Sequence, residues 1–235
     1  MFPRRRHPRP YKHVNVEPIT FAKLNKETED RVNRISEEFK NGFSLLETCT
    51  HSVTFWGSAR TKPGEPDYVR AEKLAARIHR ELGYAIITGG GPGIMAAGNC
   101  GAYDAGGKSV GLTIKLPFEQ VTNLCLTHHM DFQYFFTRKV CLAFAAEAYV
   151  YFPGGFGTLD ELFEVLTLVQ TNKITPAPAI ILYGKKFWGD LDWFIRKQLL
   201  KTEKINPEDL NLYTITDDED KIIELIKKAP IRKHG

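Results

Sequence analysis

Short apolar runs alternate with stretches of helical periodicity along most of the chain, and this alternation limits the fold more than any other feature. The apolar runs are rich in β-branched and aromatic residues, which predicts strands at 52–56, 85–88, 109–114, 148–152, 179–183 and 212–215. Helical spacing predicts helices at 27–46, 68–82, 93–105, 134–145, 159–171, 191–200 and 218–228. Strands that alternate with helices form a mostly parallel sheet with both faces covered. We therefore expect an α/β fold with a single doubly wound, Rossmann-like domain.

The beginning of the chain departs from this pattern, because it is basic and rich in proline (Arg4, Arg5, Arg6, Arg9, Lys12). We expect a basic flexible tail over 1–18 and one domain over 19–235, which opens with the N-terminal helix. Much of the formal net charge of +4 lies in this tail, so nucleic acid is an unlikely partner. No secretory signal is visible, and no apolar run is long enough to span a membrane.

The four cysteines, at positions 49, 100, 125 and 141, show no CxxC spacing and no histidines arranged around them. This pattern is more typical of reduced thiols than of a zinc site or a disulfide framework. We therefore expect a cytoplasmic protein that binds no metal.

Three glycine-bearing strand ends compete for the ligand site, which in such a fold lies beyond the carboxyl ends of the strands. They are "FWGSAR" (55–60), "TGGGPGIM" (88–95) and "FPGGFGT" (152–158). The second lacks the last glycine of a dinucleotide fingerprint, and "GGKS" at 106–109 leads into a strand, unlike a P-loop. What remains is a site for a phosphate-sized anion, and its candidate contacts are Ser58, Gly90, Gly91 and Gly93.

The loop "FPGGFGT" leads into the helix that begins "LDE". Thr158 and Glu161 have the spacing of a capping box, which is one explanation of both residues. Capping requires no glycine, however, whereas Gly154, Gly155 and Gly157 together suit a phosphate cradle built from bare N–H groups. The cradle is the interpretation that we favour.

Arg138 and Lys139 in "YFFTRK" lie on an otherwise apolar helix just before the strand that feeds this loop. The pair is either a solvated patch of charge or a site for a phosphate or carboxylate. Glu119, in "LPFEQ", is a third polar candidate, although taken alone it would be explained as an ordinary charged residue in a loop.

Arg-Lys, then a strand, then PGGxGTxxE is a specific combination. Together with "GGGPGIM" and "WGSAR" it closely resembles the LOG (Lonely Guy) family of nucleoside 5′-monophosphate phosphoribohydrolases, often labelled "lysine decarboxylase". The resemblance covers roughly residues 50 to 200. The chain departs from compact plant-type members in its longer N-terminal segment and in "YFFTRK", where those show Met-His-x-Arg-Lys.

The resemblance implies hydrolysis of the N-glycosidic bond of AMP-like or cytokinin riboside monophosphates, which gives free base and ribose 5-phosphate without a cofactor. It places the catalytic pair on Arg138 and Glu161. It places substrate contacts on Glu119, Lys139, Gly154, Gly155, Phe156, Gly157, Thr158, Leu159 and Asp160. The alternative is a non-catalytic nucleotide or molybdenum-cofactor carrier on the same fold.

The family also implies a homodimer or higher oligomer with the site near the interface. The predicted helices at 134–145 and 159–171, together with Phe132 just before the first, carry more apolar side chains than one sheet face can cover. A second apolar face is usually buried against a partner.

Overall fold

The computed structural model describes residues 21–115 and 122–231. The predicted basic tail and Glu119 therefore lie outside the described residues.

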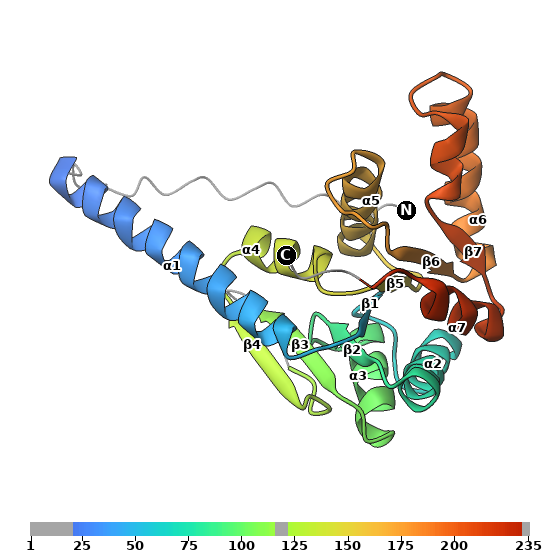
Figure 1. The fold of residues 1–235 in the computed structure, drawn as a ribbon, viewed down its shortest axis with the longest axis horizontal. Helices are drawn as coiled ribbons and strands as arrows, with labels where there is room; N and C mark the ends of the chain where they lie inside the picture. The colour runs from blue at the N-terminus through green and yellow to red at the C-terminus, as the bar shows by residue number, and fades with distance from the viewer. Residues whose placement is uncertain (1–20, 116–121, 232–235) are drawn as a thin grey trace, which may run out of the picture.

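The described residues form a seven-stranded, all-parallel sheet with helices on both faces (Figure 1). The strands are β1 (Ser52–Trp56), β2 (Ala85–Thr88), β3 (Ser109–Ile114), β4 (His128–Phe132), β5 (Ala148–Tyr151), β6 (Ala179–Tyr183) and β7 (Thr214–Thr216). Their order across the sheet is β4-β3-β2-β1-β5-β6-β7. The chain first builds outward from β1 through β2 and β3 to β4, then returns to the other side of β1 with β5. The junction of β1 and β5 is therefore the topological switch point, where such folds bind ligands.

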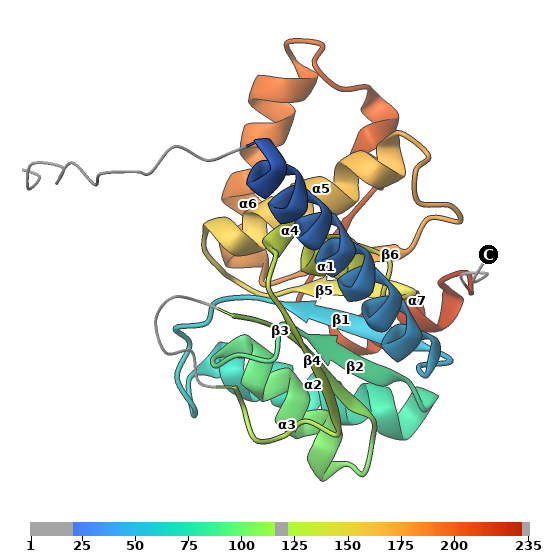
Figure 2. The same cartoon turned by 90° about the vertical axis from the view of Figure 1, so that its left-hand side faces the viewer.

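The helices divide into two layers, and Figure 2 shows α1, α4, α5 and α6 on one side of the sheet. That layer consists of α1 (Phe21–Glu47), α4 (Phe135–Ala143), α5 (Phe156–Gln170) and α6 (Lys185–Phe194), the last continued by a π-helical turn at Ile195–Leu200. The opposite layer consists of α2 (Pro66–Leu82), α3 (Ile94–Asp104) and α7 (Glu219–Lys228). A short 3₁₀ helix, Pro207–Asn211, precedes β7.

Each helix layer buries its own apolar cluster against the sheet. Successive side chains of β1 point to opposite faces of the sheet. Phe55 packs in the cluster under α2, α3 and α7, whereas Trp56 packs in the cluster under the opposite layer. Because β1, β2, β3 and β5 are buried along their whole length, their sequences are nearly continuous apolar runs. This explains why the pattern located these strands to within a residue.

The strand β4 was not predicted, and it changes the interpretation of its neighbourhood. Its residues His128, His129 and Asp131 are exposed, because β4 lies at the edge of the sheet and lacks an apolar run. Phe132 belongs to this strand and is fully buried, so it does not add to an outer apolar face of α4. The strand predicted at 212–215 is β7, which lies at Thr214–Thr216 instead.

The helix boundaries also differ from the predictions. Helix α5 starts at Phe156, three positions earlier than predicted. Its N-cap is Gly155, and no side-chain hydrogen bond caps the helix there. Thr158 therefore lies inside the first turn, and the capping box with Glu161, the alternative to the phosphate cradle, does not form. The chain enters α6 at Lys185, directly after β6, whereas the pattern placed a helix over 191–200.

The cysteines behave in two ways. Cys100 of α3 and Cys125, just before β4, form a disulfide, which contradicts the prediction of four reduced thiols. The bond joins α3, which precedes β3 in the chain, to the segment before β4, which follows β3. No cysteine spacing in the sequence indicates this pairing. Cys49 and Cys141 are free and buried, as expected.

Candidate active site

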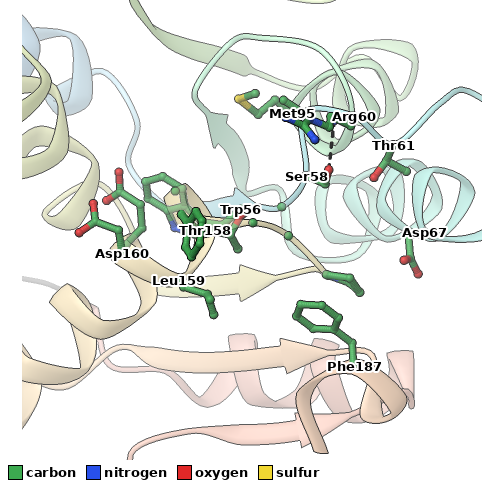
Figure 3. A pocket seen from close by; sticks show the side chains of 18 of the residues that line it. Trp56, Ser58, Arg60, Thr61, Asp67, Met95, Thr158, Leu159, Asp160 and Phe187 are labelled. Carbon is green, nitrogen blue, oxygen red and sulfur yellow. Dashed lines mark hydrogen bonds between the residues drawn. The ribbon is translucent and has the colours of Figure 1, made fainter. Parts of the chain in front are cut away.

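A cleft of about 880 Å³ opens at the switch point between β1 and β5. Backbone hydrogen bonds hold its walls together: the Ser58 N–H donates to the Pro153 carbonyl (3.0 Å), and the Ile94 N–H donates to the Ser58 carbonyl (3.0 Å). The loops after β1 and β5 and the start of α3 thus form one rigid rim. Figure 3 shows Thr158, Leu159 and Asp160 on one side of the cleft, with Ser58, Arg60, Thr61 and Asp67 on the other.

The loop after β5 and the first turn of α5 form the wall nearest the switch point. A Cβ added at Gly155 or Gly157 would meet no atom within 4 Å, so the packing of the chain itself does not require glycine there. At Gly154, by contrast, a Cβ would overlap the Thr158 side chain. The first N–H groups of α5 lack partners within the helix, and no side chain caps them. The wall therefore offers a bare backbone surface and the positive end of a helix to an anion.

Glu161 lies one turn into α5 and lines the same cleft. Its side chain is buried, and its Oε2 has no hydrogen-bond partner among the described residues. Burial raises the pKa of Glu161 to about 8, although Arg138 and Lys139 act in the opposite direction. The carboxyl group can therefore gain or lose its proton near neutral pH, which suits acid–base chemistry.

Arg138 reaches the cleft from α4. Its Nε donates a hydrogen bond to the carbonyl of Leu112 (2.6 Å), and its guanidinium lies where a Cβ on Gly89 would be. Burial lowers the pKa of Arg138, while the charge of Glu161 raises it. The guanidinium thus remains a cation fixed by β3, and within the described residues it forms no ion pair that would occupy it. The two predicted catalytic groups meet in one cleft from different helices.

Lys139 has a different environment from the one predicted. It forms ion pairs with Asp160 (2.8 Å) and Glu164 (3.3 Å) of α5, and it is not among the described residues that line the cleft. These contacts join α4 to α5, and so fix the helix of Arg138 beside the helix of Glu161. Lys139 and Asp160 were predicted as substrate contacts; the structure pairs them with each other, and Asp160 also lines the cleft.

The triple-glycine loop supports the cleft from behind. Gly90 donates its N–H to the Thr88 hydroxyl (2.9 Å), and the Gly91 carbonyl accepts from the Asn123 side chain (3.1 Å). A Cβ on Gly93 would overlap the Ser58 carbonyl. Close packing accounts for Gly90 and Gly93. None of the three glycines belongs to the described lining of the cleft. Ser58, predicted with them, does line it.

Several lining residues had no local signal in the sequence. Arg60 follows Ser58 in the same loop and was within reach of the motif analysis. Trp56, Met95 and Phe135 also lie in motifs quoted above but were not named as candidates. Thr61, Asp67 and Phe187 lie outside those motifs, and only the fold brings them to the cleft. No group of three or more histidine, cysteine or acidic side chains suited to a metal ion occurs within residues 21–115 and 122–231. In the same ranges, no helix is both long and apolar enough to cross a membrane.

Comparison with known proteins adds sequence relatives to this geometry. A family model described as "Possible lysine decarboxylase" matches residues 95–226. The cytokinin riboside 5′-monophosphate phosphoribohydrolase of Rhodococcoides fascians is 32% identical over 148 residues, which cover 60% of this chain and 71% of the relative. The probable cytokinin riboside 5′-monophosphate phosphoribohydrolase LOG6 of Arabidopsis thaliana is 30% identical over 113 residues, 48% of this chain. That match spans 56% of the Arabidopsis protein, little more than half its length.

Solved structures of similar fold include two proteins that are described as binding or carrying the molybdenum cofactor. The molybdenum cofactor binding protein of Rippkaea orientalis is 22% identical with a TM-score of 0.53, covering 75% of this chain and 93% of that one. The molybdenum cofactor carrier protein of Chlamydomonas reinhardtii is 19% identical with a TM-score of 0.54, covering 77% and 98%. At these identities the likeness shows the shared Rossmann-like architecture.

Proposed function

The chain belongs to the LOG family, and from that premise we propose that it hydrolyses the N-glycosidic bond of nucleoside 5′-monophosphates. The substrates are AMP-like or cytokinin riboside monophosphates, and the products are free base and ribose 5-phosphate. The observation that carries the proposal is Glu161, a buried, unpartnered carboxyl group in a cleft that also offers a helix N-terminus and a fixed arginine.

The proposed mechanism assigns each group one task. The N–H groups at the start of α5 bind the 5′-phosphate and hold the ribose in place. Breaking the bond between C1′ and the base nitrogen develops positive charge on the sugar, which the ionised Glu161 stabilises. A water molecule adds to C1′ through its oxygen and gives one proton to Glu161, while the base leaves with its bonding electron pair and takes a proton from solvent water. Glu161 then releases its proton to solvent, so that the protons balance. Arg138 donates hydrogen bonds to the departing base, since a guanidinium does not release its proton.

The alternative is a carrier that binds a nucleotide or molybdenum cofactor without cleaving it, in keeping with the carriers of similar fold. A carrier requires the anion-binding end of α5. It does not require a buried carboxyl group whose raised pKa disfavours the charged form. Glu161 is therefore the feature that favours the enzyme.

A panel of nucleoside 5′-monophosphates, followed by chromatography for free base, tests the proposal. We expect base release from AMP or a related nucleotide, and far slower release from adenosine, which lacks the phosphate. Arg138→Lys and Glu161→Gln should each reduce turnover by about a hundredfold or more. Tight binding of a monophosphate without cleavage would establish the carrier function instead.

We also propose that the protein works as a homodimer or larger oligomer. Three phenylalanines near the cleft expose a large share of their side chains: Phe135 (62%) and Phe136 (49%) of α4, and Phe156 (93%) of α5. Light scattering tests this, because a fully active particle at 26.7 kDa would contradict it. A cytoplasmic location is a further proposal, which fractionation of cells that make the protein tests. The disulfide between Cys100 and Cys125 does not support it, because disulfides are rare in that compartment.

A further inference from the structure

The helix α1 packs directly on the helix that carries Arg138. A Cβ added at Gly42 of α1 would lie 2.7 Å from the Cys141 sulfur of α4 and 3.1 Å from the Phe132 ring of β4. The two helices thus approach as closely as a residue without a side chain allows. Figure 2 shows α1 running across α4 on the outer side of the sheet. Any shift of α1 must therefore be accommodated by α4.

Glu38 of α1 binds the start of α4 with both of its carboxylate oxygens. The Gln133 N–H donates to Oε1 (2.5 Å). The Thr137 hydroxyl has two acceptors in reach, Oε2 of Glu38 (2.5 Å) and the Tyr134 carbonyl (2.9 Å), and Oε2 is the nearer. The N-cap residue of α4, Tyr134, makes no side-chain cap of its own. Glu38 thus places a carboxylate beside the N-terminus of α4, where it binds the residue before the N-cap and the side chain of the third helical residue.

The turn that Glu38 holds is the one that positions Arg138. Thr137 directly precedes Arg138 and is fully buried. One residue further on, the Arg138 Nε is fixed to the Leu112 carbonyl of β3. The backbone of this turn is thus tied to α1, while the guanidinium is tied to the sheet. If the tie to α1 is lost, the turn can rotate or slide, and the guanidinium must lose either its bond to β3 or its alignment with the cleft.

We infer that Glu38 is a positioning residue of the active site, which aligns Arg138 by fixing the first turn of α4 from α1. The inference rests on the proposed function, in which Arg138 acts on the reacting substrate. It assigns a role to α1, which precedes the first strand of the sheet. Because Glu38 does not line the cleft, it acts through Arg138 and not on the substrate.

The test compares Glu38→Ala with Glu37→Ala, a matched control that removes an exposed neighbouring carboxylate from the same helix. Displacement of a catalytic group by about 1 Å can cost a hundredfold in rate, so we expect kcat of Glu38→Ala to fall by roughly 30- to 100-fold. KM should change by a smaller factor than kcat, because phosphate binding at α5 is untouched. Glu38→Gln, which keeps an acceptor for the Gln133 N–H, should recover most of the activity. Glu37→Ala should match the wild type.

A double variant separates positioning from general stability. If Glu38 acts through Arg138, the loss from Glu38→Ala should largely disappear in an Arg138→Lys background. Losses that multiply in the double variant, or a Glu38→Ala enzyme within threefold of the wild type, would overturn the inference. Should Glu38→Ala fail to fold, Thr137→Val breaks the same contact from the α4 side and should still lower kcat about tenfold.

The same variants distinguish failure of this inference from failure of the proposed function. If the wild type binds AMP without cleaving it, the proposed function fails and calorimetry of AMP binding becomes the measurement. A tenfold or greater loss of affinity in Glu38→Ala, absent in Glu37→Ala, would then support Glu38 as a positioning residue. Equal affinities would overturn it, and so would a wild type that neither binds nor cleaves AMP.

Discussion

Glu161 should make the folded protein less stable as the pH rises, which is the opposite of the usual behaviour of a carboxylate in a native ion pair. The pKa of Glu161 rises from 4.5 to about 8 on burial. Between these values the folded chain keeps a proton that the unfolded chain has released. Stability linked to this group is therefore fully present below pH 4.5 and is lost as the pH rises through 8.

The size of the effect follows from the shift in pKa. One unit corresponds to about 1.4 kcal/mol, so ionisation of Glu161 should cost roughly 4 to 5 kcal/mol of folding free energy by pH 9. Glu161→Gln keeps the shape of the side chain and cannot ionise. We expect this variant to match the wild type at pH 5 and to exceed its stability at pH 9 by a few kcal/mol, even though it is inactive.

Urea unfolding of both proteins at pH 5, 7 and 9 measures the difference directly. Glu37→Gln serves as the control, because it removes a carboxylate of α1 that is exposed to solvent. It should give no gain at alkaline pH. A difference between wild type and Glu161→Gln that stays constant from pH 5 to 9 would refute the reasoning, since the buried group would then titrate alike in both states.

Further predictions concern the chemistry, the cradle and the disulfide. If the ionised form of Glu161 is the active one, kcat/KM for AMP should rise with pH and level off above about 8, whereas a fall over this range would make the group a proton donor. Gly157→Ala should fold normally, because its methyl group enters open space, yet should weaken AMP binding about tenfold or more; unchanged binding would remove the cradle. Gly154→Ala should instead lower the melting temperature, because its methyl group overlaps Thr158. Cys100→Ser should lower the free energy of unfolding by about 3 kcal/mol, and the unreduced wild type should release two free thiols on unfolding, not four.

The sequence predicted the parts of the fold whose signal is local. Strands buried on both faces, such as β1 and β3, must be apolar throughout, so a run of residues was enough to find them. The sequence predicted helix α5 but placed its start too late, because Thr158 and Glu161 have the spacing of a capping box. The actual N-cap is Gly155. A capping motif and a ligand loop use the same residue types, and only the backbone separates them.

The site shows the same division between local and distant information. Arg138 and Glu161 each lie in a short recognisable motif, and their convergence follows from parallel topology. The ion pairs of Lys139 with Asp160 and Glu164 could not be predicted from the sequence, because they depend on how α4 lies beside α5. Cys100 and Cys125 illustrate the same limit, since β3 lies between them in the chain and their contact arises from tertiary packing.

The two outer strands of the sheet bear on how the protein avoids aggregation. A parallel sheet ends in rows of unpaired N–H and C=O groups that can recruit a strand from another chain. Here β7 has only three residues, too few to template a stable addition. At the other end β4 presents His128, His129 and Asp131 to solvent, side chains that disfavour a dry contact between sheets. The polarity that conceals β4 from hydrophobic pattern analysis thus limits association through this edge of the sheet.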